Sequence, residues 1–139
     1  MDFWSSLLRP SNFPAKEKIL LETEGLLFLT ERNRVTVVYK NFKSRHRRCT
    51  YKKEVLWGSL AISQQSLVGF ALRKKIIHLA FAEEKARKVK FSCVDDKVLV
   101  VVFDPSLFMP ETSGGMEIRY HFDEAAEAYR IIKQQISIA

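Results

Sequence analysis

The chain has 139 residues, of which 47% are hydrophobic and 28% are charged, and its formal net charge is +7. This length suits one hydrophobic core and excludes a pair of ordinary domains, while the apolar content excludes an intrinsically disordered chain. No apolar run approaches the roughly 20 residues that span a bilayer, and the first ten residues lack the basic and apolar regions of a secretory signal.

The chain is expected to begin with an apolar extension, residues 1–15, ahead of a single domain at residues 16–139. The segment MDFWSSLL suits a short helix that ends before Pro10. The apolar residues on one side of this helix are Phe3, Trp4, Leu7 and Leu8. A helix this short is marginal alone, so we expect it either to dock on its own domain or a partner, or to insert at a membrane interface.

Period-two apolar patterns and β-branched runs dominate the chain after this extension, and they predict a mainly β domain. Strands are expected at residues 18–22, 26–30, 34–40, 56–63 (ending there or continuing through 66–71), 75–81, 88–93, 97–103 and 116–122. Tight turns are expected at residues 23–25, 31–33, 73–74 and 94–96. Strands joined in this way predict an antiparallel sheet that closes into a barrel or stacks as a sandwich.

A basic segment follows the third expected strand. Residues 40–53, KNFKSRHRRCTYKK, contain no acidic residue, and their formal charge equals the +7 of the whole chain. The basic residues are Lys40, Lys43, Arg45, Arg47, Arg48, Lys52 and Lys53. Guanidinium and ammonium groups bind phosphate and carboxylate oxygens, so this concentration predicts an anion-binding loop. The alternative is a solvated loop whose charges oppose aggregation or pair with acids on a neighbouring subunit.

Two smaller basic groups and one apolar tip lie further along the chain. The basic groups, at residues 73–75 and 85–90, either extend the basic segment or only protect strand edges. The tip consists of Leu107, Phe108 and Met109, between two prolines in the long connection at residues 104–115. We expect it either to anchor in a membrane or partner, or to fold inward as a lid.

Residues that carry catalysis are present but scattered. The three histidines are far apart in the sequence, and Asp95 and Asp96 suit a hairpin turn better than an acid–base pair. Cys49 and Cys93 lack the spacing of a zinc site or a disulfide framework. Nucleotide-binding and hydrolase motifs are absent from the sequence. We therefore expect a non-enzymatic protein without metal or cofactor, with both thiols free in a reducing compartment.

The segment DEAAEAYRIIKQQI predicts an amphipathic helix near the end of the chain. Its apolar side consists of Ala125, Ala128, Tyr129, Ile132 and Ile136. Asp123 suits the N-cap, and the acidic and basic residues at the two ends complement the helix dipole. We expect the apolar side to cover an open end of the sheet or a gap between sheets.

Three segments occur in an order known from other proteins: GLLFLTERNRV at residues 25–35, SLVGF at 66–70 and MEIRYHFDEAAEAYRIIKQQI at 116–136. In these short motifs the chain resembles the pleckstrin-homology-like superfamily, in particular its GRAM and bacterial pleckstrin-homology branches. The resemblance implies a partly open antiparallel barrel of about seven strands, capped by the C-terminal helix. The chain departs from the family in its long basic connection, in the 104–115 loop and in the N-terminal extension.

The resemblance also implies that ligands bind on the loops at the open end of the barrel, where related domains hold phosphoinositide head groups. In this alignment Lys43, Arg45, Arg47 and Arg48 lie on that rim. The family's lipid signature places basic residues across the first and second strands, whereas the corresponding turn here, at residues 22–25, is acidic. This departure favours diffuse electrostatics or a protein ligand.

We therefore predict a cytoplasmic, non-enzymatic binding module whose basic segment engages an acidic protein partner, in a groove beside the C-terminal helix, or an anionic membrane surface. One alternative is a peripheral domain at the inner membrane face that binds phosphoinositide or other anionic lipids and uses the apolar anchors. Another is a nucleic-acid binder in which Phe42 and Tyr51 stack on bases. Exposed apolar termini further favour a homodimer.

Overall fold

The computed structural model describes residues 14–72 and 74–139. Its elements in chain order are α2 (Ala15–Glu24), β1 (Leu26–Lys43), β2 (Arg48–Ser63), β3 (Ser66–Ala71), β4 (Lys74–Ala80), the 3-10 helix η1 (Glu84–Lys88), β5 (Lys90–Val94), β6 (Val98–Phe103), the 3-10 helix η2 (Pro105–Leu107), β7 (Ser113–His121) and α3 (Ala125–Ile138). The predicted apolar helix of the N-terminal extension, with Phe3, Trp4, Leu7 and Leu8, lies outside the described residues.

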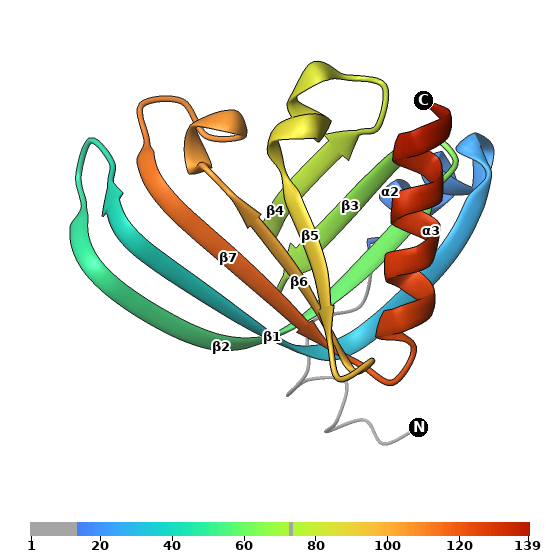
Figure 1. The fold of residues 1–139 in the computed structure, drawn as a ribbon, viewed down its shortest axis with the longest axis horizontal. Helices are drawn as coiled ribbons and strands as arrows, with labels where there is room; N and C mark the ends of the chain where they lie inside the picture. The colour runs from blue at the N-terminus through green and yellow to red at the C-terminus, as the bar shows by residue number, and fades with distance from the viewer. Residues whose placement is uncertain (1–13, 73) are drawn as a thin grey trace.

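The seven strands form one antiparallel sheet in the order β4-β3-β2-β1-β7-β6-β5. β1 lies at its centre, paired with β2 on one side and with β7 on the other. The sheet is strongly bent, so its two halves curve around a common interior (Figure 1). Its edge strands, β4 and β5, are not paired with each other, and the barrel is therefore open. The prediction of a mainly β fold, with seven antiparallel strands and a C-terminal helix, is confirmed.

Helix α3 fills one side of this interior and contacts β5, β6 and β2. Ala125, Ala128 and Ile132 are buried, and Tyr129 and Ile136 pack against the same core, as the apolar pattern predicted. The predicted N-cap is wrong. Glu124 holds that position without a capping hydrogen bond from its side chain, and the Asp123 carboxylate instead pairs with the Lys97 ammonium at 3.2 Å.

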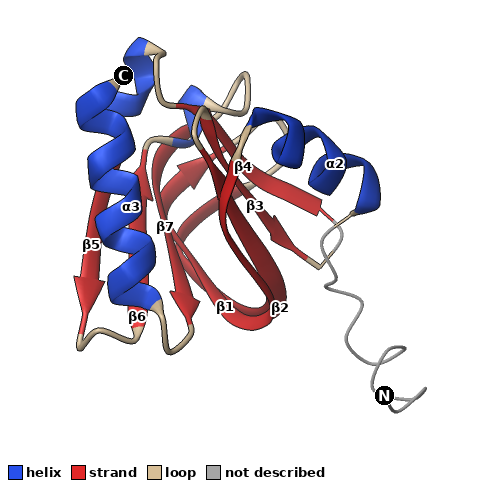
Figure 2. Ribbon diagram, turned by 90° about the vertical axis from the view of Figure 1, so that its right-hand side faces the viewer, coloured by secondary structure: helices blue, strands red, loops and turns tan. Residues whose placement is uncertain are grey.

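The strand predicted at residues 18–22 is wrong, because these residues belong to helix α2. The sequence AKEKILLETE is rich in alanine, lysine, glutamate and leucine, which have high intrinsic helix propensity. Gly25 ends the helix with φ of 92°, a left-handed conformation that costs glycine little. Leu21 packs with Ala61, Val68 and Phe70 in a second apolar cluster, separate from the main core. Figure 2 shows α2 and α3 on opposite sides of the strands.

Hydrogen bonds to Glu24 connect the end of α2 to the turn between β2 and β3. Its carboxylate oxygen Oε1 accepts hydrogen bonds from the hydroxyls of Ser63 and Ser66, each at 3.0 Å. The Gln64 amide also donates to the Gly25 carbonyl oxygen at 2.9 Å. Both serines are buried, so these bonds satisfy hydroxyl groups that water cannot reach.

Residues 26–30 and 34–40 form a single strand rather than two strands with a turn. The predicted turn at residues 31–33 is an irregularity in β1, where the register with β2 shifts between Thr30 and Asn33 and Arg32 has φ of 58°. An extra residue of this kind bends a strand and increases its twist. The bend allows β1 to contribute to both halves of the sheet. The turn predicted at residues 94–96 is confirmed, with Asp95 and Asp96 at positive φ.

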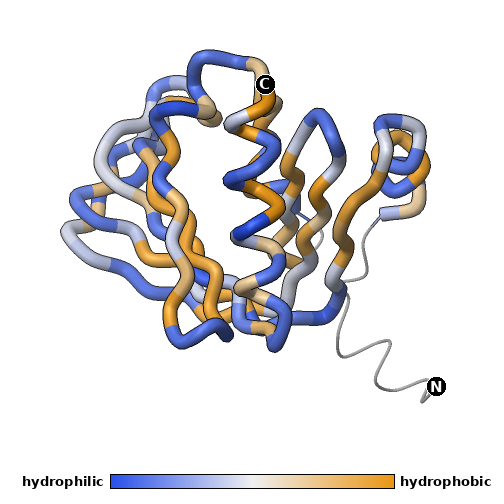
Figure 3. Tube along the Cα trace, turned by 45° about the vertical axis from the view of Figure 1, so that its right-hand side comes forward, coloured by the Kyte–Doolittle hydropathy of each residue, from blue (hydrophilic) through white to orange (hydrophobic). Residues whose placement is uncertain are grey.

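The basic segment is a hairpin and not a loop, since β1 runs to Lys43 and β2 begins at Arg48. It also connects the first and second strands, whereas we expected it after the third. Apolar residues concentrate in the strands that surround the interior, while the hairpin ends are largely hydrophilic (Figure 3). Because a projecting hairpin has little core to cover, its sequence lacks the apolar alternation that marks a strand.

Leu20 and Leu21 provide a direct test of how α2 docks. Leu21 is 2% exposed in its cluster, whereas Leu20 is 59% exposed. Leu21→Ala should lower the free energy of unfolding by roughly 2–4 kcal/mol, because it removes buried methyl groups and leaves a cavity. Urea denaturation measures the change. Leu20→Ala is the control and should shift stability by less than about 0.5 kcal/mol; equal effects would mean that α2 does not dock through Leu21.

Candidate functional site

The basic residues of the hairpin line different hollows. Arg47, Arg48 and Lys52 line a small pocket of about 200 Å³ beside Tyr39 and Phe42. Lys43 and Arg45 line a groove at the hairpin end. Lys40 and Lys53 line neither of these hollows. That all seven residues bind one anion or partner together stays a prediction.

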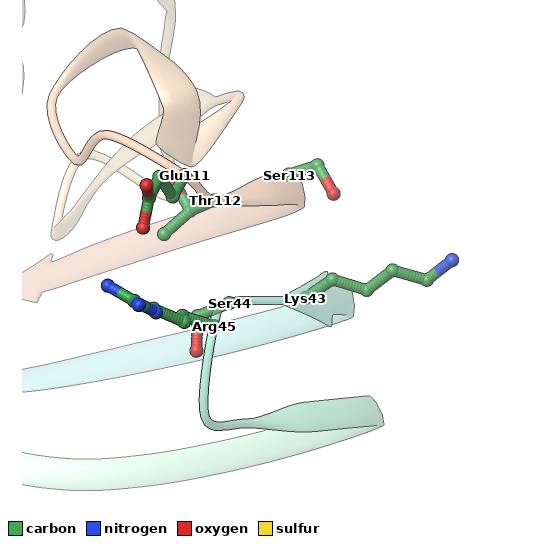
Figure 4. A pocket seen from close by; sticks show the side chains of 6 residues that line it. All are labelled: Lys43, Ser44, Arg45, Glu111, Thr112 and Ser113. Atoms are coloured by element: carbon green, nitrogen blue, oxygen red, sulfur yellow. The ribbon is translucent and has the colours of Figure 1, made fainter.

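The groove at the hairpin end is open and has a volume of about 570 Å³. It runs between the β1–β2 turn and the residues that lead into β7. Figure 4 shows Arg45 on the β1–β2 turn and Glu111 in the segment before β7 extending from its two walls. A carboxylate thus faces the arginine, which makes this groove a weaker anion site than its cations alone would indicate.

A second cavity, with a volume of about 620 Å³, lies at the open end of the bent sheet. The β1–β2 hairpin, β4, the segment around η1, the connection that holds η2 and the start of β7 all contribute to its lining. In Figure 1 the hairpin, η1 and the η2 connection rise together at the top of the molecule. We call this cavity the open-end cavity.

The open-end cavity has an apolar wall. Its half-buried members are Ile76, Phe108 and Met109, and its buried members are Phe42, Ile77 and Met116. The tip at residues 107–109 contributes two of them, since it folds toward the core instead of projecting into solvent. The Phe108 ring meets the Phe103 ring edge-on, with 5.0 Å between centroids. Of the two expectations for this tip, the arrangement therefore matches the inward-folded lid.

Basic side chains also line the open-end cavity. They are Arg47, Lys74, Lys75 and Lys85. Two of them already have partners: the Lys75 ammonium lies 2.7 Å from Glu17 of α2, and the Lys85 ammonium lies 3.4 Å from Glu83 and 5.5 Å from the Phe108 centroid. The side chains of Arg47 and Lys74 pair with no carboxylate within residues 14–72 and 74–139. These two cations are the ones best placed to bind an anionic ligand.

The pKa of Tyr39 depends on the charged groups around it, one of which is Arg47. Burial raises the pKa of its phenol, the nearby Glu54 carboxylate raises that pKa further, and the Arg47 guanidinium lowers it. The Lys52 ammonium pairs with Glu54 at 2.9 Å, and the Phe42 ring contacts the Tyr39 ring edge-on at 5.2 Å. Arg47 therefore lies close enough to Tyr39 to stabilise a negative charge there.

A different basic cluster surrounds His121 on β7. Burial lowers the pKa of its imidazole, and the cations Arg34, Arg119 and Lys53 lower that pKa further. Nε2 of His121 lies 3.0 Å from the Thr36 hydroxyl oxygen. None of these residues lines the open-end cavity. Lys53, although part of the basic segment, thus belongs to a separate surface.

Phe42 and Tyr51 do not form the stacking platform that a nucleic-acid binder would need. Phe42 is 8% exposed and belongs to the main core, whereas Tyr51 is 61% exposed. Phe42 therefore exposes little of its ring to a base. This arrangement leaves the nucleic-acid alternative without its proposed aromatic pair.

Sequence reasoning identified Arg47, Phe108 and Met109 separately, and it marked residues 73–75 and 85 as basic. It did not bring them together, and it missed the wall residues Ile77 and Met116. These two look like ordinary core positions of a strand, so the sequence carried no signal that they border a cavity. Residue 73 lies outside the described residues.

In the part of the chain that the structure describes, no group of three or more His, Cys, Asp and Glu side chains is arranged to hold a metal ion. The described helices are all too short or too polar to cross a bilayer. A scan of the sequence against models of known protein families gives no match, and a search of curated proteins gives none either.

Replacing Arg47 with Gln should raise the pKa of Tyr39, because the neighbouring cation that favours the phenolate is lost. An NMR titration of protein labelled at tyrosine measures this value. The control is Lys53→Gln, which removes the same charge from the surface near His121 and should leave the pKa of Tyr39 unchanged. An equal response to the two substitutions would contradict the placement of Arg47.

Proposed function

We propose that the chain is a pleckstrin-homology-like, non-enzymatic binding module that attaches to an anionic membrane surface through the open end of its barrel. The observation that carries this proposal is the combination of an apolar wall with two cations, Arg47 and Lys74, that line the same cavity and pair with no carboxylate among the described residues. Anionic lipids present a charged head group above apolar chains, so they match both parts of the site.

The position of the basic hairpin supports this proposal. The acidic residues at 22–25, which seemed to occupy the turn between the first two strands, lie at the end of helix α2. The basic residues instead span the first and second strands, β1 and β2. That is where the resemblance expects basic residues in members that bind lipid. The acidic residues at 22–25 therefore do not count against the binding of a head group between β1 and β2.

The energetics of basic surfaces at membranes fit such a role. A basic residue near an anionic leaflet contributes on the order of 1 kcal/mol, and the attraction weakens over a Debye length of about 10 Å at 0.1 M salt. Arg45, Arg47 and Arg48 are exposed at the hairpin end, and Arg47 lines the open-end cavity together with Lys74. Together they would support reversible, salt-sensitive attachment.

Replacing both Arg47 and Lys74 with uncharged residues tests this proposal. The double variant Arg47→Gln/Lys74→Gln should bind phosphatidylserine-rich vesicles about 30-fold more weakly than the wild type, since two contributions of about 1 kcal/mol are lost. Co-sedimentation with neutral, phosphatidylserine-rich and phosphoinositide-containing vesicles, at low and high salt, measures the binding. A preference for phosphoinositide at matched charge would support a head-group site in the open-end cavity.

The matched control is Lys40→Gln/Lys53→Gln, which removes the same net charge from residues that do not line the open-end cavity. It should weaken binding far less than the cavity variant. Equal losses would show diffuse electrostatics without a site at the open end. If the wild type binds no vesicle at low salt, the proposal is wrong and an acidic protein partner becomes the better explanation of the cations.

A further inference from the structure

The open-end cavity has more apolar lining than the binding of a charged head group requires. A phosphate or carboxylate needs only donors at the surface, and Arg47 and Lys74 supply them at the rim. The same cavity is lined by the half-buried apolar residues Ile76, Phe108 and Met109 and by the buried Phe42, Ile77 and Met116. The volume of about 620 Å³ falls inside the range of roughly 300–1,000 Å³ found for pockets that enclose small ligands.

We propose that this cavity takes up a single acyl chain from an amphiphile with one anionic head. The chain would lie against the apolar wall, and the head would remain at the rim beside Arg47 and Lys74. The inference rests on the proposed attachment to anionic lipid and extends it, because it assigns the hydrocarbon part of the ligand to a defined place in the fold.

The chemistry of the lining favours this occupant over an acidic peptide. The cavity combines two cations that pair with no carboxylate in the described residues, Arg47 and Lys74, with half-buried apolar side chains, so it suits a ligand that has an anionic part and a hydrocarbon part. An acidic peptide carries a polar amide at every residue, and each amide placed against the apolar wall would lose hydrogen bonds to water. An acyl chain has no such groups.

The wall is held in place by hydrogen bonds within its own connection. The Asp104 carboxylate accepts a hydrogen bond from the Ser106 amide at 2.9 Å at the start of η2. The Thr112 hydroxyl donates to the Met109 carbonyl oxygen at 2.6 Å. A backbone ordered in this way lowers the entropy lost on binding. The Met109 side chain remains adaptable, as a flexible thioether suits a chain of variable shape.

Alkyl phosphates of increasing length test the inference directly. Hexyl, octyl, decyl and dodecyl phosphate, each below its critical micelle concentration, are titrated into the full chain by calorimetry. Burial of each methylene should tighten binding about fourfold, so each added pair should give roughly a fifteenfold gain until the cavity is full. Inorganic phosphate alone should bind weakly.

Two substitutions at Met109 test whether the acyl chain binds in the open-end cavity. Met109→Trp places a larger side chain in the cavity, so affinity should stop rising at a shorter chain than in the wild type, while Met109→Ser makes the wall more polar and should reduce the gain per methylene. Binding of both variants to phosphatidylserine-rich vesicles is measured alongside. Thermal unfolding of each variant shows whether it is folded, and the Met109→Ser result decides the matter if Met109→Trp is not.

The outcomes separate this inference from the proposed function. Affinity that does not change with chain length, with vesicle attachment intact, overturns the acyl-chain inference and leaves the proposed function standing. A chain-length dependence that is the same in both Met109 variants as in the wild type also overturns it, because the chain then binds elsewhere. Equal affinity for an uncharged alkyl glucoside of matched length would instead contradict the role of Arg47 and Lys74, and with it the proposed function.

Discussion

The fold depends on one continuous strand. β1 extends over Leu26–Lys43 and is hydrogen-bonded to β2 on one side and to β7 on the other. Because it belongs to both halves of the sheet, its irregularity between Thr30 and Asn33 sets how strongly the sheet bends. A flat sheet would leave its apolar face open to water. The bend instead encloses that face and leaves two edge strands, β4 and β5, that do not meet.

The interior of this open barrel is filled by a helix on one side and contains a cavity at the open end. Helix α3 buries Ala125, Ala128 and Ile132 against the main core and fills one side. Within residues 14–72 and 74–139 no α-helix lines the open-end cavity, which is bordered by the hairpin, β4, the two connections with 3-10 helices and the start of β7. The half-buried apolar residues Ile76, Phe108 and Met109 therefore line the same cavity as the cations Arg47 and Lys74. The proposed function follows from this difference between the two sides.

The sequence predicted the elements whose side chains report burial and missed those whose side chains do not. The strands near residues 66–71 and 97–103 and helix α3 carry apolar periodicity, because each has a face in the core. The hairpin at residues 40–53 has almost no core to cover, so its charges made it look like a loop. Helix α2 buries only Leu21, too little for a helical pattern. The open-end cavity joins Arg47, Lys74 and Met109, which the topology alone brings together.

In the proposed function the open end, and no other surface, binds the lipid. Amide chemical-shift mapping by NMR, with phosphatidylserine-containing nanodiscs titrated into the wild-type chain, tests this assignment. We expect the largest changes at residues 44–47, 74–78, 83–85 and 108–112, which lie around the open-end cavity. Changes centred on Arg34, Lys53 and His121, or on β5 and α3, with the cavity residues unaffected, would contradict it.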